Sequence, residues 1–324
     1  MTRVAPAPAF GFLAVMVVTA FALAIGVGSV ALDPATVLRA LAGSGDATAR
    51  GIVQGLRLPR AVAAFATGGS LALAGAILQV LLRNPLADPY VLGVSGGAAV
   101  GALIAMLVGA AAWATPVGAF AGAVASTAIV FVLARSSGAW SPIRLLLTGV
   151  IIASGWGALV ALILSLAPET QLRGMLFWLI GDLSSAPAAW TPLAILAVGI
   201  AVVLPFARDL NALARGESVA AALGVAVTRL PWLMFSLAAL LTAVAVTTAG
   251  AIGFVGLIVP HGVRLLFGND QKIALPASVL TGGALLLAAD TLARTAVAPS
   301  QLPVGIVTAL VGVPVFLYLL LRER

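Results

Sequence analysis

The stretch FGFLAVMVVTAFALAIGVGSVAL (residues 10–32) is an uninterrupted apolar run with the length of about twenty residues that a helix needs to cross a bilayer. Similar runs follow along the whole chain. Charged residues make up only 8% of the sequence, and the mean hydropathy is +1.19. Both values lie far outside the range of soluble globular domains. The sequence therefore predicts an all-α, polytopic membrane protein.

The spans can be separated at clusters of polar residues, proline and arginine. This gives about ten candidates, near residues 10–32, 61–82, 91–110, 115–134, 143–166, 190–207, 230–249, 252–267, 273–295 and 303–321. The eighth is short and rich in glycine. We expect the first to be retained as a span, because its apolar run continues beyond the signal-cleavage-like Ala22-Leu23-Ala24. Without a long polar stretch, residues 1–324 are expected to form a single transmembrane domain.

Basic residues predict the orientation, because cytoplasmic loops carry an excess of them. With the amino terminus inside, eleven of the seventeen basic residues are cytoplasmic and six are external. The internal group comprises Arg3, Arg83, Arg135, Arg144, Arg208, Arg215, Arg229, Arg264, Lys272, Arg322 and Arg324. The external group comprises Arg39, Arg50, Arg57, Arg60, Arg173 and Arg294. Both termini are therefore expected inside. The scattered arginines form no stripe, which argues against nucleic-acid binding.

Several chemistries are excluded by what the chain lacks. A phosphate-binding loop needs a lysine followed by serine or threonine, but the single lysine, Lys272, precedes Ile273. If the protein moves anything with energy from ATP, hydrolysis must take place on another polypeptide. One histidine, His261, and no cysteine cannot build a typical zinc or iron site. We therefore expect no metal, no cofactor and no enzymatic activity in this chain alone.

Ion-coupled transport usually needs an ionisable group near the middle of the membrane. The ten acidic residues all lie in loops or near span ends. The nearest exception is Asp290, four residues before Arg294, so an ion pair between these two is expected. This argues against a proton relay, although sodium sites built from carbonyls and hydroxyls stay open.

Four motifs stand out in the loops and at the span ends. They are Arg57-Leu58-Pro59-Arg60; Asn84-Pro85-Leu86-Ala87-Asp88-Pro89 leading into Leu92-Gly93-Val94-Ser95-Gly96-Gly97; Leu213-Ala214-Arg215-Gly216-Glu217-Ser218 through Gly224; and Ala249-Gly250-Ala251-Ile252-Gly253-Phe254 through Pro260-His261. In this order, followed by Asp290, Arg294 and Leu302-Pro303-Val304-Gly305, they resemble the FecCD-type permease subunits of bacterial type II ABC importers for vitamin B12, ferric siderophores and haem. The resemblance runs from about residue 50 to the carboxy terminus.

The resemblance implies a homodimer in the bacterial inner membrane, two cytoplasmic ABC ATPase subunits and a periplasmic substrate-binding protein. It implies that Arg57, Arg60 and Arg294 meet carboxylates of the binding protein on a basic outer surface. Exposed ion pairs contribute only about 0.2–1 kcal/mol each, so such contacts would mainly set orientation and encounter rate. The alternative is that these arginines mark topology or contact lipid phosphates.

The cytoplasmic stretch 209–225 is broken by Gly216 and Gly224, which predicts two small helices joined at a bend. The resemblance implies that this loop, with Gly216, Glu217 and Gly224, docks on the ATPase and transmits its closure. The alternative is an ordinary solvated loop.

Asn84 and Leu86 resemble a cytoplasmic gate of the vitamin B12 permease, and Pro85 disfavours helix at Asn84. A plain turn between helices is the alternative. Thr148, Ser165, Thr242 and Thr308 are candidate pathway hydroxyls, although most such groups bond back to their own helix.

The predicted function is therefore ATP-driven import of a bulky metal chelate through this permease. The nature of the chelate, whether siderophore, haem or cobalamin, stays open. The rival interpretation is an ion-coupled secondary transporter that works without an ATPase and would not need the 209–225 loop.

Overall fold

The computed structural model describes residues 6–135, 141–184, 189–298 and 300–322, and the regular structure in these ranges is entirely helical. Among these described residues, seven helical segments are long and apolar enough to cross a membrane. They contain α1 (Pro6–Gly26), α4 (Leu58–Leu81), α6 (Ala114–Arg135), α7 (Pro142–Leu166), α9 (Trp190–Val203), α12 (Leu230–Ala249) and α14 (Gln271–Thr295). Three shorter apolar helices, α5 (Val94–Leu107), α13 (Val255–Phe267) and α15 (Val304–Arg322), complete the ten expected segments. The predicted all-α membrane fold is confirmed.

Other helices occur where the sequence analysis expected only loops. α2 (Pro34–Leu41), α3 (Ala47–Arg50) and the π-helical turn η1 (Gly51–Arg57) lead into α4. The helix α8 (Glu169–Ile180) follows α7 and carries an apolar end, Leu176–Ile180, that is too short to count as a span. Asp33 and Asp46 accept hydrogen bonds from the first turns of α2 and α3, which explains where these two short helices begin.

The helix α4 is the centre of the bundle and is buried along nearly its whole length. Glycines allow its neighbours to approach closely. A Cβ atom added to Gly68 would lie 2.2 Å from the carbonyl oxygen of Gly282 in α14, and one added to Gly75 would lie 1.9 Å from that of Gly256 in α13. Because lipid supplies no hydrophobic force between helices, such close packing is what stabilises the bundle.

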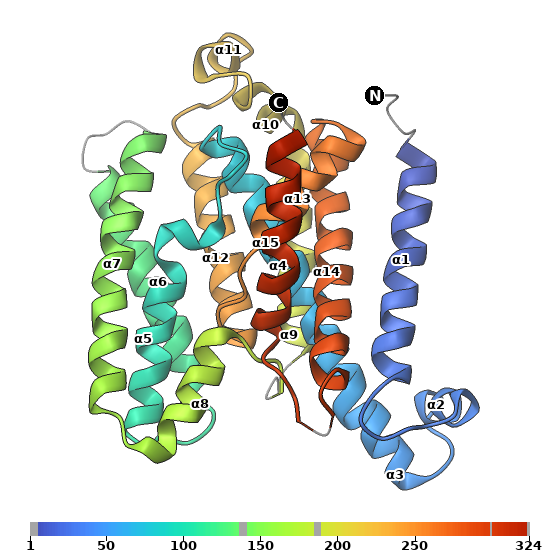
Figure 1. The fold of residues 1–324 in the computed structure, drawn as a ribbon. Helices are drawn as coiled ribbons and strands as arrows, with labels where there is room; N and C mark the ends of the chain where they lie inside the picture. Colours follow the sequence, from blue (N-terminus) through green and yellow to red (C-terminus); the bar gives the residue numbers. More distant parts are fainter. Residues whose placement is uncertain (1–5, 136–140, 185–188, 299, 323–324) are drawn as a thin grey trace.

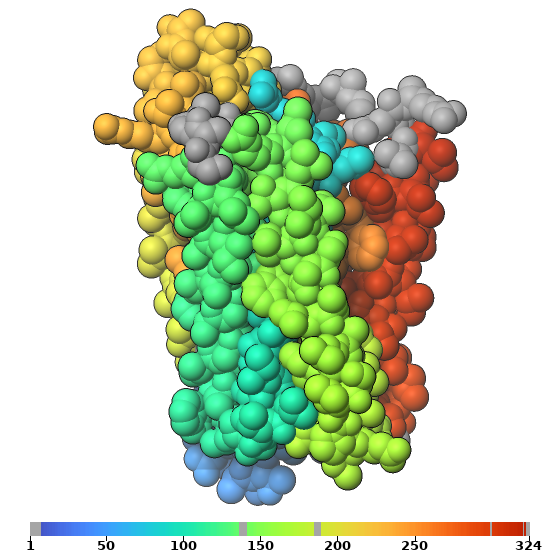
Figure 2. Space-filling view, turned by 90° about the vertical axis from the view of Figure 1, so that its left-hand side faces the viewer, coloured from blue at the N-terminus to red at the C-terminus, as the bar shows by residue number. Residues whose placement is uncertain are grey.

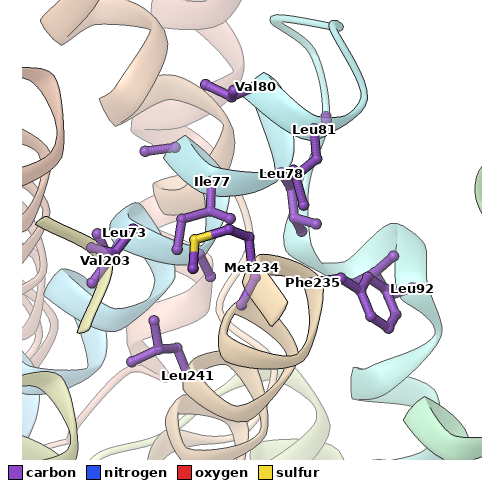
Figure 3. Packing of buried hydrophobic residues seen from close by; sticks show 14 of the residues in the cluster. Leu73, Ile77, Leu78, Val80, Leu81, Leu92, Val203, Met234, Phe235 and Leu241 are labelled. Atoms are coloured by element: carbon purple, nitrogen blue, oxygen red, sulfur yellow. The ribbon is translucent and has the colours of Figure 1, made fainter. Parts of the chain in front are cut away.

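Apolar side chains fill the space on the other sides of α4. Figure 3 shows Leu73, Ile77 and Leu78 of α4 beside Met234 and Leu241 of α12. Each of these five side chains is fully buried.

The bundle has two distinct ends (Figure 1). The first described helix begins, and α15 ends, at the end that also carries α10 (Ala207–Leu213) and α11 (Glu217–Ala222). The short helices α2 and α3 lie at the opposite end. Figure 2 shows α11, in gold, projecting beyond the bundle. Arginines predicted to be external and one predicted to be cytoplasmic therefore lie at opposite ends, since Arg39 and Arg50 lie in α2 and α3 while Arg208 lies in α10.

Candidate functional site

The segment 209–225 folds as two short helices, as predicted. Gly216 separates α10 from α11 with a backbone φ of +121°, and Gly224 follows α11 with a φ of +82°. Residues with a Cβ atom rarely adopt such backbone angles, so glycine is required at the bend. The two glycines fix the shape of the projecting segment.

The helix α10 is held firmly to the bundle. Its Leu210 and Leu213 are buried, and Asn211 makes two hydrogen bonds to the beginning of α14. The Asn211 Nδ2 donates to Asp270 Oδ1 at 2.8 Å, and the backbone amide of Gln271 donates to Asn211 Oδ1 at 2.9 Å. Asp270 also accepts from the amide of Lys272 as the N-cap of α14. The hydrogen bond from Asn211 is the largest cause of a pKa of Asp270 below its ordinary value.

The helix α11 is held to the bundle much less firmly than α10. Glu217 makes an ion pair with Arg83 at 3.5 Å, and the side chains are 41% and 43% exposed. Exposed pairs of this kind contribute at most about 1 kcal/mol. Glu217 is therefore free to exchange this partner for another.

The helical structure is interrupted between α4 and α5, as the proline-rich motif predicted. The Asn84 side chain accepts from the amide of Leu86 at 2.9 Å, which makes a tight turn, and Leu86 is 41% exposed. The short helix η2 (Pro89–Leu92) follows and leads into α5. A break is thus present at Asn84, whereas the gating role of Asn84 and Leu86 stays a prediction.

One buried polar residue near this break was missed by the sequence analysis. Gln79 of α4 is 4% exposed. It donates to the Leu257 carbonyl at 3.1 Å and accepts from the Arg264 guanidinium. Both partners lie in α13, so Gln79 joins α4 to α13. A lone glutamine in an apolar span was the available signal.

At the opposite end, a buried ion cluster joins α4 to α14. The Arg60 Nη2 and Nε both donate to Asp290 Oδ1, at 2.9 and 3.0 Å, and Arg60 also donates to Gln301. The predicted pair of Asp290 and Arg294 is confirmed at 3.4 Å. With 2% exposure, Asp290 is shared by two arginines. A buried carboxylate of this kind depends on its positively charged partners, here Arg60 and Arg294, for stabilisation.

The expected exposed basic surface of Arg57, Arg60 and Arg294 is wrong for two of its three members. Arg57 is 5% exposed and donates to the carbonyls of Ile25 and Gly26 at 2.9 and 3.0 Å. Arg294 is 8% exposed and donates to the Ala24 carbonyl. The free carbonyls at the end of α1 need donors, and these guanidinium groups supply them. Only Arg60 keeps partial exposure, with 14% of its side chain accessible. The docking role itself is left as a prediction.

The ends of α8 and α12 and the beginnings of α13 and α15 meet at one junction. α8 ends at Ile180, α12 ends at Ala249, and α13 and α15 begin nearby. The Asp182 amide donates to the Ala249 carbonyl at 2.8 Å, and the Gly305 amide donates to the Gly181 carbonyl at 3.4 Å. Within a membrane, irregular backbone of this kind is tolerated only where protein or a cavity surrounds it.

Glycine makes this junction of α8, α12 and α15 possible. A Cβ atom on Gly305 would lie 1.7 Å from the Ile180 carbonyl oxygen, and one on Gly250 would lie 2.2 Å from that of Trp178. The backbone amide of Ile252 donates to the Tyr90 hydroxyl at 2.8 Å, which joins the junction to η2. Two of the sequence motifs, around Gly250 and Gly305, thus meet at one place.

Three of the four candidate pathway hydroxyls bond to their own helices, as expected of most such groups. Ser165, Thr242 and Thr308 donate to the carbonyls of Leu162, Ala238 and Gly305, respectively. None of these three bonds leaves the residue's own helix, so they give no evidence of a pathway.

In the described residues, a bundle of membrane-spanning helices with α11 projecting at one end is the architecture of a polytopic membrane protein. The chain belongs to the FecCD transport family, whose model matches residues 15–322. Permeases of this family are subunits of ABC transporters, in which a separate subunit carries the ATPase.

Individual relatives cover nearly the whole chain. It is 46% identical over 283 residues to the cobalamin import system permease protein BtuC of Halobacterium salinarum, which covers 86% of this chain and 75% of that protein. It is 40% identical over 335 residues to the hemin transport system permease protein HmuU of Yersinia pestis, which covers 99% and 98%. A solved inward-facing structure, provisionally classed as a metal-chelate type ABC transporter, superimposes with a TM-score of 0.88 at 30% identity, covering 98% of this chain and 100% of the other.

Proposed function

We propose that this chain forms the membrane path of an ATP-driven importer for a bulky metal chelate. Two copies would work with two ABC ATPase subunits in the cytoplasm and a substrate-binding protein outside, in the bacterial inner membrane with both termini cytoplasmic. The family membership over almost the whole chain and the excess of basic residues at one end support this arrangement.

The observation that carries the ATPase assignment is the construction of the segment 207–222. α11 projects from the bundle with an exposed Glu217, while α10 is fastened to α14 through Asn211 and Asp270. A partner that binds α11 and moves it therefore pulls on α14. We assign Gly216, Glu217 and Gly224 to docking of the ATPase, because the two glycines fix the bend and Glu217 is accessible.

The binding protein would dock at the opposite end, around the ion cluster of Arg60, Asp290 and Arg294. Arg60 is the member that can reach a partner carboxylate directly. Arg57 and Arg294 are assigned to positioning, because they hold the end of α1 against α14 and η1. Asn84 and Leu86 are assigned to the cytoplasmic gate, since they break the chain at the end that faces the ATPase.

The chelate is proposed to be cobalamin, with haem and a ferric siderophore as the competing substrates. Identity to one cobalamin permease is 46% and to several vitamin B12 permeases 38% or 39%, compared with 40% to a hemin permease. The experiment is uptake into proteoliposomes that hold this chain, its ATPase and its binding protein, with each of the three labelled chelates.

Accumulation of cobalamin that needs ATP on the side of the ATPase would support the proposal. ATP-dependent accumulation of haem or siderophore alone would keep the class and change the substrate. Movement that continues when the ATPase subunit is omitted would refute it in favour of a secondary transporter.

A further inference from the structure

A shallow groove runs along the bundle surface between α6 and α12. It encloses about 320 Å³. α6 contributes Thr127, Ala128 and Phe131, and α12 contributes Ser236, Ala239 and Ala243. Three alanines make the hollow, and the Thr127 hydroxyl is already bonded to the Ala123 carbonyl at 2.8 Å. The groove therefore offers an apolar wall to whatever lies in it.

Aromatic rings gather around Phe131, which lines the groove. The Phe131 ring, which lines it, lies 4.7 Å from the Trp232 ring in an edge-on arrangement, and the Trp232 ring lies 6.0 Å from that of Phe235. Trp232 belongs to the first turn of α12, at the end of the bundle that carries α10 and α11. Tryptophan is enriched at this depth, where the apolar core of a membrane meets the headgroups.

Positive charge follows directly after the aromatic rings. The Arg135 guanidinium lies 5.6 Å from the centre of the Phe131 ring and is exposed. Arg229 is also exposed, three residues before Trp232. Neither α6 nor α12 contains an acidic residue. An anionic group beside these two helices would thus meet the positive charge of Arg135 and no carboxylate of α6 or α12.

The order of apolar groove, aromatic rings and arginines is the order of acyl chain, interface and phosphate in a phospholipid. From Val124 to Phe131 the groove follows about 10 Å of helix, which fits within one leaflet of a hydrocarbon core about 30 Å thick. We propose that the groove between α6 and α12 binds one anionic phospholipid, with an acyl chain against Ala128, Ala239 and Ala243 and the phosphate at Arg135.

A second copy of this chain fits the groove less well. A symmetric contact through α6 and α12 would bring Arg135 and Arg229 close to their own copies, and like charges repel. A single phosphate instead neutralises the guanidinium, and an arginine near an anionic membrane surface typically strengthens binding about fivefold. The proposal does not depend on which substrate the permease moves.

The test is native mass spectrometry of the purified full chain in detergent, with added phosphatidylglycerol or phosphatidylcholine. The wild type should retain one phosphatidylglycerol in preference to phosphatidylcholine. Arg135→Gln should weaken that preference about fivefold. Ala128→Leu, at an exposed position, should fill the groove and reduce retention of both lipids. Arg50→Gln replaces an exposed arginine at the opposite end and should change neither the preference for phosphatidylglycerol nor the retention of lipid.

Equal effects of Arg135→Gln and Arg50→Gln would show only general attraction of charge and would overturn the proposal. Unchanged lipid retention in Ala128→Leu would also overturn it. If Ala128→Leu instead converted a dimer to a monomer with lipid retention intact, the groove would be a protein interface. The melting temperature of each variant, compared with the wild type, shows that a loss of lipid does not come from unfolding.

Discussion

Asn211 and Asp270 lie 59 positions apart in the sequence, and a 2.8 Å hydrogen bond joins their side chains where α10 meets the beginning of α14. The bond has a reciprocal partner, because the amide of Gln271 donates back to Asn211 at 2.9 Å. The far end of α14 carries Asp290, which joins α14 to α4, and Arg294, which joins α14 to α1. One continuous helix therefore connects the projecting segment with the ion cluster at the opposite end.

Asn211→Ala should destabilise the protein by about 1–2 kcal/mol, because it removes two hydrogen bonds, one of them to a carboxylate. The measurement is thermal unfolding in detergent at neutral pH. Asn269→Ala is the matched control, since it changes a neighbouring exposed asparagine and should stay within about 0.5 kcal/mol of the wild type. Equal stability of the two variants would show that the bond contributes nothing.

The contribution of Asp270 should depend on pH in a defined direction. Its pKa lies below the ordinary value, chiefly because of the bond from Asn211, so the folded state binds the proton less well than the unfolded state. The stabilisation is then complete above the unfolded value of about 4 and is lost as pH falls through the lower folded pKa. The stability gap between wild type and Asn211→Ala should stay constant from pH 7 to 5 and narrow below pH 4. A gap that narrows already between pH 7 and 5 would contradict this assignment.

Arg60→Ala should destabilise the protein by about 3 kcal/mol, because it leaves the buried Asp290 with Arg294 alone. Arg39→Ala, at an exposed position in α2, should cost less than about 0.5 kcal/mol. Arg60→Lys should recover only part of the loss, since an ammonium cannot make the forked contact of a guanidinium. Melting temperatures in detergent rank the variants, and an Arg60→Ala protein as stable as Arg39→Ala would refute the role of the cluster.

Gly305→Ala should disrupt the junction inside the bundle, because the new Cβ would lie 1.7 Å from the Ile180 carbonyl oxygen. Backbone must shift to make room, so we expect a loss above about 3 kcal/mol, as for severe overpacking. The control is Gly262→Ala in α13, where a Cβ meets nothing within 4 Å. That substitution should be neutral or stabilising by up to about 1 kcal/mol. The yield and the melting temperature of the two variants measure this difference in stability.

Glu217→Arg should weaken binding of the ATPase subunit at least tenfold while changing stability by no more than about 1 kcal/mol, because its ion pair with Arg83 is exposed. The affinity is measured between purified subunits at physiological salt. Arg215→Glu, which alters charge one residue before the bend, tests whether the effect belongs to Glu217 or to overall charge. If both reversals have the same effect, the assignment of Glu217 fails.

The sequence predicted the helices well where hydropathy alone decides them. The ten apolar runs correspond to seven long and three short helices. The bend at Gly216 was also predictable, because glycine readily adopts the positive φ that this bend requires. α8 was missed because its apolar end, Leu176–Ile180, is too short to give a spanning run by hydropathy.

The side-chain partners were harder to predict than the helices. The ion pair of Asp290 and Arg294 follows from their spacing on one helix, but the bond of Asp290 to Arg60 depends on how α4 meets α14. Burial of Arg57 likewise depends on the end of α1, whose carbonyls it satisfies. Charge pattern alone predicted an exposed surface there, because it contains no information about which backbone groups lie nearby.

We propose that the ATPase moves α11 and that Asn211 passes this movement to α14. The measurement for this coupling is the amount of chelate taken up per ATP hydrolysed in proteoliposomes with the complete importer. For Asn211→Ala we predict unchanged binding of the ATPase and at least a fivefold lower ratio of uptake to hydrolysis than for Asn269→Ala. Equal ratios in the two variants, with equal ATPase binding, would show that Asn211 does not transmit the movement.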